Sequence, residues 1–309
     1  MNFQQLRIIR EAVRRDFNLT EVASVLATSQ SGVSKHIRDI EDELGAEIFL
    51  RRGKRLLGLT KAGQTIMGYV ETILTDAGNI KRLAEELRAA DQGALALATT
   101  HTQARYALPS VISGFRKAFP QVRLALHQTS PTEITSMLLD GRADIGIATE
   151  ALALHPDLVT FPYYTWHHAV VVAKGHPLEG HAQPLSLQDI AAYPIITYHA
   201  GFTGRPMIDR TFEAAGIKPD IVMAAMDADV IKAYVGLGLG IGLLAAMSVD
   251  AARETGLSLL RADHLFAENT SYIALRRGRF QRGFACRFIA LCRPDLSEAH
   301  IRKSVQPPS

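Results

Sequence analysis

The segment that most constrains this chain is residues 20–45, in which two short helical patterns are separated by small residues. Thr20 can cap the first helix, and Glu21 places negative charge in its first turn, where backbone N–H groups lack partners. The buried side of this helix is expected to consist of Val22, Ala23, Val25 and Leu26. Residues 27–29, Ala-Thr-Ser, interrupt the pattern and are small enough to let two helices cross closely. The segment therefore predicts a helix-turn-helix.

The second helix of this pair is predicted to begin near Gln30. Its apolar positions recur at helical spacing and are expected to face inward: Val33, Ile37, Ile40 and Leu44. Its outer face carries amide, hydroxyl and basic groups, which can reach base edges and phosphates in a major groove. The predicted DNA contacts on this helix are Gln30, Ser31, Ser34, Lys35 and Arg38. An ordinary amphipathic helix pair is the alternative, and the segments that follow argue against it.

A basic hairpin is predicted directly after these helices. Two short extended segments flank the turn RRGKR, in which four cations surround one glycine. Such a tip can lie along a phosphate backbone, which gives sequence-independent affinity and strong salt dependence. Arg51, Arg52 and Lys54 are therefore predicted DNA contacts. A charge run is more often a solvated turn, but after a helix-turn-helix it indicates the wing of a winged helix.

A long helix is predicted from Thr60 to about Ala90. Its apolar residues recur at alternating steps of four and three, the pattern of a coiled-coil seam: Ile66, Val70, Ile73, Ala77, Ile80, Ala84 and Leu87. At roughly 1.5 Å per residue it would be about 45 Å long, too long for a lone surface helix. We expect it to pair with its copy, so that a dimer presents two recognition helices to two half-sites. Packing of the seam onto the same chain is the alternative.

Short strands and helices alternate after a hinge at residues 91–93, which argues for parallel sheets covered on both faces. The pattern divides into two lobes joined by crossing segments near residues 162–169 and 265–270. Such lobes form a cleft at the carboxyl ends of the strands, where small ligands bind. The predicted α/β chain has a winged helix-turn-helix (1–59), a long linker helix with a hinge (60–92) and a two-lobed, periplasmic-binding-protein-like effector domain (93–309; lobe I about 93–164 and 268–309, lobe II about 165–267).

Hydroxyl groups gather at the predicted cleft. The run TTHTQ at residues 99–103 lies between a strand and a helix, where backbone N–H groups without partners can bind an anion. Thr149 directly follows another strand and is expected at the same sheet edge. Across the cleft, the loop GFTGR at residues 201–205 offers further N–H groups, a hydroxyl and a guanidinium. Three threonines around one turn favour an anionic ligand over a simple helix cap.

Two features could indicate an enzyme, and neither has the required context. The glycines of residues 236–242 follow a helix and lead into a strand, the reverse of the dinucleotide-binding arrangement. The Trp-His-His cluster at residues 166–168 lacks a serine elbow, a carboxylate pair or metal-ligand spacing, so we expect it to line a crossing between the lobes. Cys286 and Cys292 are expected to be buried thiols. No catalytic residue, metal or cofactor is predicted.

The composition is that of a soluble globular protein with more than one domain. Hydrophobic residues make up 47% of the 309 positions and charged residues 21%. The net charge of +3 does not by itself indicate DNA binding, because the local concentration of charge decides that question. No uncharged apolar run is long enough to span a bilayer, and the N-terminus lacks an apolar signal region. We therefore predict a cytoplasmic protein with no membrane contact.

Taken together, the winged helix, the long helix and the two-lobed module resemble the LysR-type transcriptional regulators across essentially the whole chain. Within that family the chain resembles the CysB-like subfamily of cysteine-regulon activators, which includes regulators of sulfonate use. The resemblance is carried by ATTHTQARYALP (98–109), ADIGIATEAL (143–152), GFTGR (201–205) and DADVIKAYVGLGLGIG (227–242). It departs from the subfamily at Ser31, where relatives often carry proline, and at His199 and Ala200, which replace bulkier residues.

The resemblance implies a regulator of sulfur-assimilation and cysteine-biosynthesis genes, controlled by sulfate, thiosulfate, acetylserine or adenylyl sulfate. It implies a tetramer assembled from dimers on double-stranded promoter DNA, and it allows a contact with RNA polymerase. The effector contacts that it assigns are Thr100, Thr102, Gln103, Thr149 and Thr203. Regulation of sulfonate or organosulfur use within the same family is the first alternative. A solute-binding protein is the second, and the winged helix and missing signal peptide argue against it.

Overall fold

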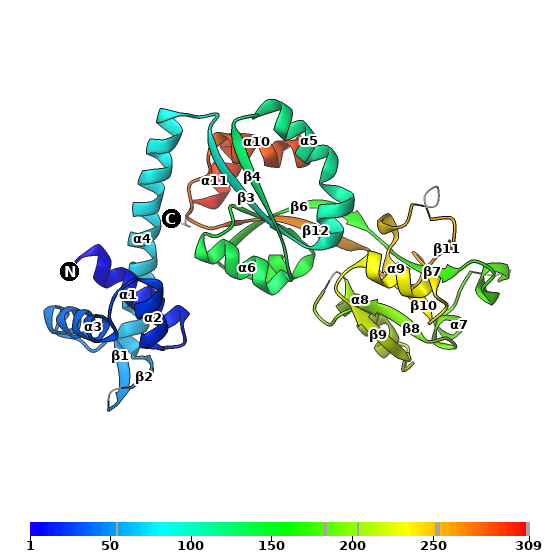
Figure 1. The fold of residues 1–309 in the computed structure, drawn as a ribbon, viewed down its shortest axis with the longest axis horizontal. Helices are drawn as coiled ribbons and strands as arrows, with labels where there is room; N and C mark the ends of the chain where they lie inside the picture. The colour runs from blue at the N-terminus through cyan, green and yellow to red at the C-terminus, as the bar shows by residue number, and fades with distance from the viewer. Residues whose placement is uncertain (54, 182–183, 203, 251–253, 307–309) are drawn as a thin grey trace. The chain divides into compact units, whose positions relative to one another are not determined.

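The computed structural model describes residues 1–53, 55–181, 184–202, 204–250 and 254–306 (Figure 1). Two residues with a predicted role, Lys54 and Thr203, lie outside the described residues. The chain forms two compact units, Met1–Leu87 with Gly278–Phe280, and Arg88–Arg277 with Gln281–Ser309. The first unit contains the helix-turn-helix and the long helix, and the second contains two α/β lobes, which confirms the predicted fold class.

The first unit is a winged helix followed by a long helix. Its core is formed by apolar side chains from every element, including Ile9, Val22, Ile37, Phe49 and Val70, all at most 1% exposed. The predicted second helix begins at Gln30 as expected. The elements are α1 (Phe3–Arg14), α2 (Leu19–Val25), α3 (Gln30–Leu44), β1 (Phe49–Arg52), β2 (Arg55–Leu59) and α4 (Lys61–Arg88).

Three details of the helix-turn-helix differ from the prediction. Asn18, not Thr20, caps α2, because its side-chain oxygen accepts from the backbone N–H groups of Thr20 and Glu21 at 3.1 and 3.4 Å. Val25 is 51% exposed, since the buried face of α2 contains residues 19, 22, 23 and 26 at steps of three and four. Leu44 is the last residue of α3 and is 42% exposed, outside the core cluster.

The long helix α4 starts where it was predicted to start. The Thr60 hydroxyl accepts from Gly63 N at 2.9 Å and donates to Glu47 O at 2.6 Å, which fixes the first turn to the segment just before β1. Gly63 approaches the backbone so closely that a Cβ atom there would lie 2.0 Å from Ile48 O. Only glycine allows this contact.

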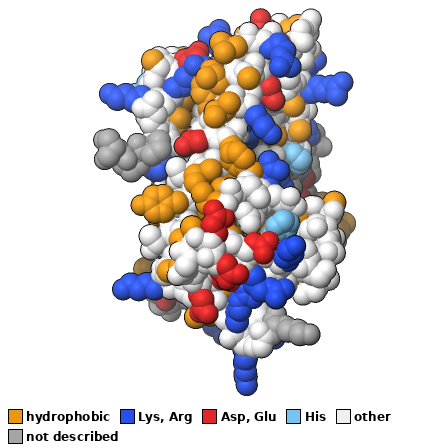
Figure 2. All heavy atoms as spheres, turned by 90° about the vertical axis from the view of Figure 1, so that its left-hand side faces the viewer, with side chains coloured by type: hydrophobic (Ala, Val, Ile, Leu, Met, Phe, Trp, Pro, Cys, Tyr) orange, Lys and Arg blue, Asp and Glu red, His pale blue; other side chains and the backbone are white. Residues whose placement is uncertain are grey.

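The apolar seam of α4 has two different environments. Val70, which was expected to contact a second chain, is 1% exposed and packs into the core of its own winged helix, together with Leu74. Farther along the helix the apolar side chains are exposed: Ile73 is 37% exposed, Ile80 70%, Leu83 44% and Leu87 80%. Figure 2, which views the molecule from the side of α4, shows hydrophobic side chains gathered on this face with charged groups around them. The second half of the seam is available for a partner.

Lobe I of the second unit is a five-stranded sheet covered by helices on both faces. The strand order is β4-β3-β5-β12-β6, in which β3 pairs in parallel with β4 and β5, and β12 runs antiparallel to β5 and β6. Its elements are β3 (Gly93–Thr99), η1 (Gln103–Ala107), α5 (Pro109–Ala118), β4 (Val122–Gln128), α6 (Pro131–Asp140), β5 (Ile145–Ala148), η2 (Glu150–Leu154), β6 (Leu158–Trp166), β12 (Asn269–Arg276), α10 (Gly283–Cys292) and α11 (Glu298–Val305).

Lobe II is a second five-stranded sheet, with the order β11-β7-β10-β8-β9. Its elements are β7 (His168–Ala173), η3 (Pro177–Gly180), α7 (Leu187–Ala191), β8 (Ile195–Tyr198), α8 (Arg205–Ala214), β9 (Ile221–Ala225), α9 (Ala228–Gly236), β10 (Ile241–Ala245), η4 (Ala246–Ser248) and β11 (Leu257–Arg261). The chain passes from lobe I to lobe II between β6 and β7 and returns between β11 and β12, which confirms the two predicted crossings (Figure 1).

The sheets and one helix of this unit depart from the prediction. Both sheets are mixed. In lobe I, β12 pairs antiparallel with β6, and in lobe II, β7 pairs antiparallel with both β10 and β11. The single helix expected after the TTHTQ run is divided into the π-helical turn η1 and α5, because Pro109 cannot donate a backbone hydrogen bond and starts a new helix. Two further helices of this unit, α10 and α11, begin at Gly283 and Glu298.

Candidate DNA-binding face and effector cleft

The outer face of α3 presents the predicted DNA-contacting residues to solvent. Gln30, Ser31, Lys35 and Arg38 are exposed and Ser34 is half-buried, opposite the buried Val33, Ile37 and Ile40. The first turn is ordered by Ser29, whose hydroxyl accepts from Gly32 N at 3.1 Å and lies 3.1 Å from the Ser31 hydroxyl. Arg38 folds back toward Ser34 O at 3.3 Å. The polar groups of α3 therefore form one continuous face.

The two described arginines of the predicted hairpin contacts have different surroundings. Arg51 forms an ion pair with Glu41 of α3, a side chain that is only 9% exposed. Glu41 also accepts the backbone N–H groups of Ile48 and Phe49 at 2.8 and 3.1 Å. Arg52 is exposed beside it on β1. The carboxylate thus fixes the hairpin to α3, and this anchoring role of Glu41 was not predicted from the sequence.

The predicted threonines of lobe I meet at one edge of its sheet. Thr100 and Thr102 follow β3, and Thr149 follows the adjacent parallel strand β5. All three are buried, with exposed fractions of 2%, 1% and 4%. The hydroxyl oxygens of Thr100 and Thr102 have no hydrogen-bond partner among the described residues. Buried hydroxyls without partners are costly to maintain and indicate a ligand position.

Gln103 is fully buried and already has two partners. Its amide nitrogen donates to the Ser271 hydroxyl at 3.0 Å, and its amide oxygen accepts from the Tyr164 hydroxyl. Tyr164 and Ser271 are opposite one another on the crossing strands β6 and β12. Gln103 therefore ties the threonine segment to the strands that connect the lobes.

The Trp-His-His cluster lies at the crossing, as predicted. Trp166 ends β6, His168 begins β7, and their rings are 5.0 Å apart. Asn269 of β12 donates to His168 Nδ1 at 3.2 Å, which leaves the proton of the neutral ring on Nε2. Burial, with a smaller effect of the neighbouring His167, lowers the pKa of His168 to about 3, so the ring is uncharged at neutral pH. Trp166 Nε1 and His168 Nε2 have no partner in the described part of the chain.

Gly204 lies against this crossing. Gly204 has φ +71°, and a Cβ atom there would lie 2.6 Å from Trp166 Cη2 and 2.8 Å from His168 Nε2. The Arg205 guanidinium is bonded to Tyr198 O and to Asp209 Oδ1. Burial raises the pKa of Tyr198, the last residue of β8, to about 12, and its phenol lies beside Thr102 without completing a hydrogen bond to it. The two lobes thus approach each other at the threonines.

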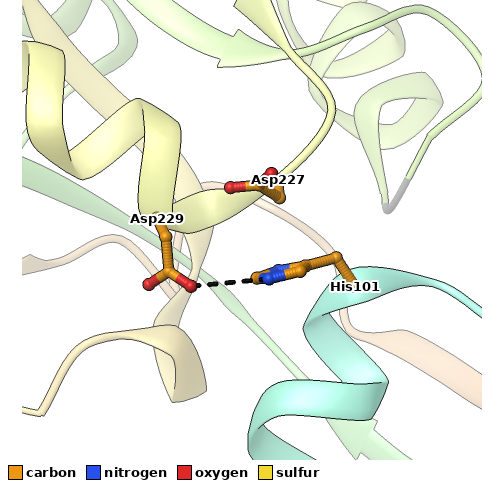
Figure 3. A group of neighbouring side chains, drawn as sticks. All are labelled: His101, Asp227 and Asp229. Carbon is orange, nitrogen blue, oxygen red and sulfur yellow. Dashed lines mark ion pairs between the residues drawn. The ribbon is translucent and has the colours of Figure 1, made fainter. Parts of the chain in front are cut away.

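One group of side chains in the described chain has the composition of a metal site. His101, Asp227 and Asp229 each offer one ligand atom, and these atoms lie within 4.8 Å of one another (Figure 3). Asp227 caps α9, because its Oδ1 accepts from Val230 N at 2.9 Å. The Lys232 ammonium lies 3.1 Å from Asp229 Oδ1 and would repel a cation. We attribute the group to helix capping and ion pairing.

The winged helix and two-lobed cleft define the class to which the chain belongs. Residues 3–64 match the family model described as a bacterial regulatory helix-turn-helix protein of the lysR family, and residues 88–297 match the LysR substrate binding domain. The chain belongs to the LysR family of transcriptional regulators. No described helix combines the length and the apolar character that crossing a membrane demands.

The similar proteins place the chain in the CysB-like group of transcriptional regulators. It is 58% identical over 301 residues to the transcriptional regulator SsuR of Burkholderia cenocepacia, covering 97% of each protein. It is 46% identical over 306 residues to CysB of the same organism, covering 99% of this chain and 97% of CysB. The crystal structure of the cofactor-binding domain of the Cbl regulator matches with 50% identity and a TM-score of 0.67, over 69% of this chain and 93% of that domain.

Proposed function

We propose that this chain regulates transcription of sulfur-assimilation and cysteine-biosynthesis genes by binding promoter DNA through α3 and the hairpin, under the control of a small oxyanion or acetylserine-type effector in the cleft. The main observation in favour of effector binding is that the hydroxyls of Thr100 and Thr102 are buried and have no hydrogen-bond partner among the described residues. A DNA-binding regulator acts where the chromosome is, so we assign it to the cytoplasm.

The chemistry of the cleft favours a ligand that accepts hydrogen bonds. The unpartnered groups of Thr100, Thr102 and Trp166 can all donate, and none of them carries a charge. A fully ionised oxyanion has only acceptor oxygens and can use each such donor. Sulfate, thiosulfate, adenylyl sulfate and the carboxylate of acetylserine all have these oxygens. We assign the effector contacts to Thr100, Thr102, Gln103, Thr149 and Thr203.

The exposed apolar half of α4 supports assembly into dimers and, from dimers, a tetramer. Two copies pairing through this face would bring two α3 helices to the half-sites of one operator.

We infer that effector binding closes the lobes and changes how the dimers contact DNA, which requires different affinity for the two states. The same DNA bend with and without effector, measured by gel mobility of circularly permuted fragments, would contradict this mechanism.

Calorimetric titration with the four candidate effectors tests the cleft. Thr102→Ala is expected to weaken effector binding while leaving affinity for operator DNA unchanged. Thr135→Ala is the matched control, because the Thr135 hydroxyl is bonded to Pro131 O within α6 and is not offered to a ligand. Equal binding by wild type and Thr102→Ala would remove this threonine from the site.

Promoters of genes for sulfonate or organosulfur use are the second candidate target. The identity to SsuR, 58%, exceeds the identity to CysB, 46%, so this chain stands nearer to the former in sequence. Gel-shift titrations on promoters of both gene classes, with each effector present in turn, distinguish the two targets.

A further inference from the structure

Three neighbouring side chains of lobe I converge on one carboxylate of lobe II. Tyr106, on the π-helical turn η1, donates its hydroxyl to Asp229 Oδ1 at 2.6 Å. His101 Nε2 lies 3.6 Å and Arg105 Nε 3.9 Å from the other oxygen, Oδ2. Asp229 belongs to the first turn of α9, and Figure 3 shows it facing His101. These contacts join the segment that carries the threonines to the opposite lobe.

A buried lysine holds the same carboxylate on its own lobe. Lys232 is 8% exposed, and its ammonium lies 3.1 Å from Asp229 Oδ1, donates to Ser248 O at 2.7 Å and pairs with Glu254. It also donates to the Tyr106 hydroxyl at 3.0 Å. Lys232 thus keeps partners within lobe II if the lobes separate, whereas both hydrogen bonds of the Tyr106 hydroxyl cross the cleft.

Asp229 and Lys232 are both charged at neutral pH. Burial alone would raise the pKa of Asp229, but hydrogen bonds from Tyr106 and Lys232 hold it below its ordinary value. Burial alone would lower the pKa of Lys232, and its hydrogen bonds to Glu254, Tyr106 and Asp229 raise it instead. Tyr106 therefore meets an ion pair, and hydrogen bonds to charged groups are the stronger kind.

The position of Tyr106 in the chain ties the contact to the candidate effector site. The turn η1 begins at Gln103, directly after Thr102, and Tyr106 lies within this turn. Single π-helical turns of this kind are frequent at functional sites. A displacement of the threonine segment must move the Tyr106 hydroxyl relative to Asp229.

We propose that Tyr106 and Asp229 form an interlobe clasp that sets the affinity of the cleft for its effector, with Tyr106 as a positioning residue. The proposal rests on the proposed effector site and adds to it the group that holds the lobes closed. The Tyr106 hydroxyl stabilises only the closed arrangement, because its partners belong to the other lobe. By linkage, an effector that binds the closed cleft strengthens the clasp, and loss of the clasp weakens the effector.

Sulfate titrated into the full-length chain tests the clasp. Calorimetry gives the affinity, and fluorescence of Trp166, the only tryptophan of the chain, reports the crossing between the lobes. Tyr106→Phe removes the hydroxyl alone and is expected to weaken sulfate binding about tenfold. Tyr234→Phe is the matched control, an exposed tyrosine on the same helix as Asp229. Tyr106→Phe combined with Asp229→Asn should weaken binding by less than the sum of the two single losses, because the two side chains share a hydrogen bond.

Unchanged sulfate affinity in Tyr106→Phe would overturn the clasp, and so would strictly additive losses in the double variant. Failure of the proposed function is recognised separately, because then the wild-type chain binds none of the four candidate effectors. In that case hydrogen exchange of the ligand-free chain decides: faster exchange in η1 and α9 of Tyr106→Phe than of Tyr234→Phe supports the clasp, and equal exchange refutes it.

Discussion

The guanidinium of Arg51 is paired with Glu41, the carboxylate that also accepts the backbone N–H groups at the start of the hairpin. Arg51 is therefore partly neutralised and serves to hold the hairpin on α3. Arg52, one residue later, is exposed on the same strand. Two adjacent arginines of the predicted DNA-binding hairpin thus differ in what they can offer to a phosphate.

This difference predicts distinct salt dependences of DNA binding. Arg52→Ala should weaken binding to all duplexes and lower the slope of log affinity against log salt by about one, because one phosphate contact is lost. Arg51→Ala should change that slope less and lower the melting temperature, because it leaves Glu41 without its cation. Gel-shift titrations at several salt concentrations and thermal denaturation measure the two effects. Identical slopes for both variants would contradict the assignment.

Two glycines of α4 are predicted to respond in opposite ways to substitution by alanine. Gly63→Ala should destabilise the protein by about 1–3 kcal/mol or more, since its Cβ atom would overlap Ile48 O. Gly68→Ala, in the same helix, has no neighbour within 4 Å and should stabilise it by up to about 1 kcal/mol, because alanine favours helices. Chemical denaturation followed by circular dichroism compares them. A stabilising Gly63→Ala would disprove the close backbone contact.

The buried imidazole of His168 predicts that stability falls in weak acid. Its pKa is about 3 in the folded chain, below the ordinary value of 6.5, so the unfolded chain binds the extra proton as the pH falls. The effect of His168 on the free energy of unfolding is absent above pH 6.5. Between pH 6.5 and pH 3 it lowers the free energy of unfolding by up to about 1.4 kcal/mol per pH unit.

The measurement is thermal unfolding between about pH 7 and pH 4, followed by Trp166 fluorescence, because Trp166 lies beside His168. His168→Asn keeps an acceptor for Asn269 and should show a smaller loss of melting temperature over this range. His127→Asn, at an exposed position of β4, should behave like the wild type. If His168→Asn lost as much stability as the wild type, another group would be responsible.

The exposed half of α4 predicts that dimerisation is lost on a single charge insertion. Ile80→Asp places a carboxylate at a seam position that is 70% exposed in one chain and would be buried between two. Light scattering should show loss of the dimer, and operator affinity should fall because two half-sites are no longer bound together. Leu154→Asp, at an 84% exposed position of η2, is the control and should leave the assembly unchanged. An intact dimer in Ile80→Asp would place the interface elsewhere.

The elements could be predicted where a local pattern determines them. The period of Val33, Ile37 and Ile40 identified α3 and its buried face, and the small residues before Gln30 identified its start. The cap of α2 was misplaced because Asn18 and Thr20 are both good capping residues, and only the backbone geometry selects between them. Val70 was misassigned because the same apolar period runs along the whole of α4, although only part of it packs against the winged helix. Val70 lies in that buried part, and the rest of the seam is exposed.

The candidate site could be predicted only on the side where hydroxyls follow strands. Thr100, Thr102 and Thr149 were found because parallel strands end at the same edge. The contact between Tyr106 and Asp229 joins residues 123 positions apart, and no local pattern encodes it. The ion pair of Arg51 with Glu41 was missed for a similar reason, since both side chains belong to charged runs that are usually solvated.

The close approach of Gly204 to Trp166 and His168 limits how this sensor can diverge. Any side chain at position 204 would collide with both rings, so a mutant chain cannot adapt to a new metabolite by changing that residue alone. New ligand preferences must arise from substitutions at neighbouring positions, while position 204 remains glycine.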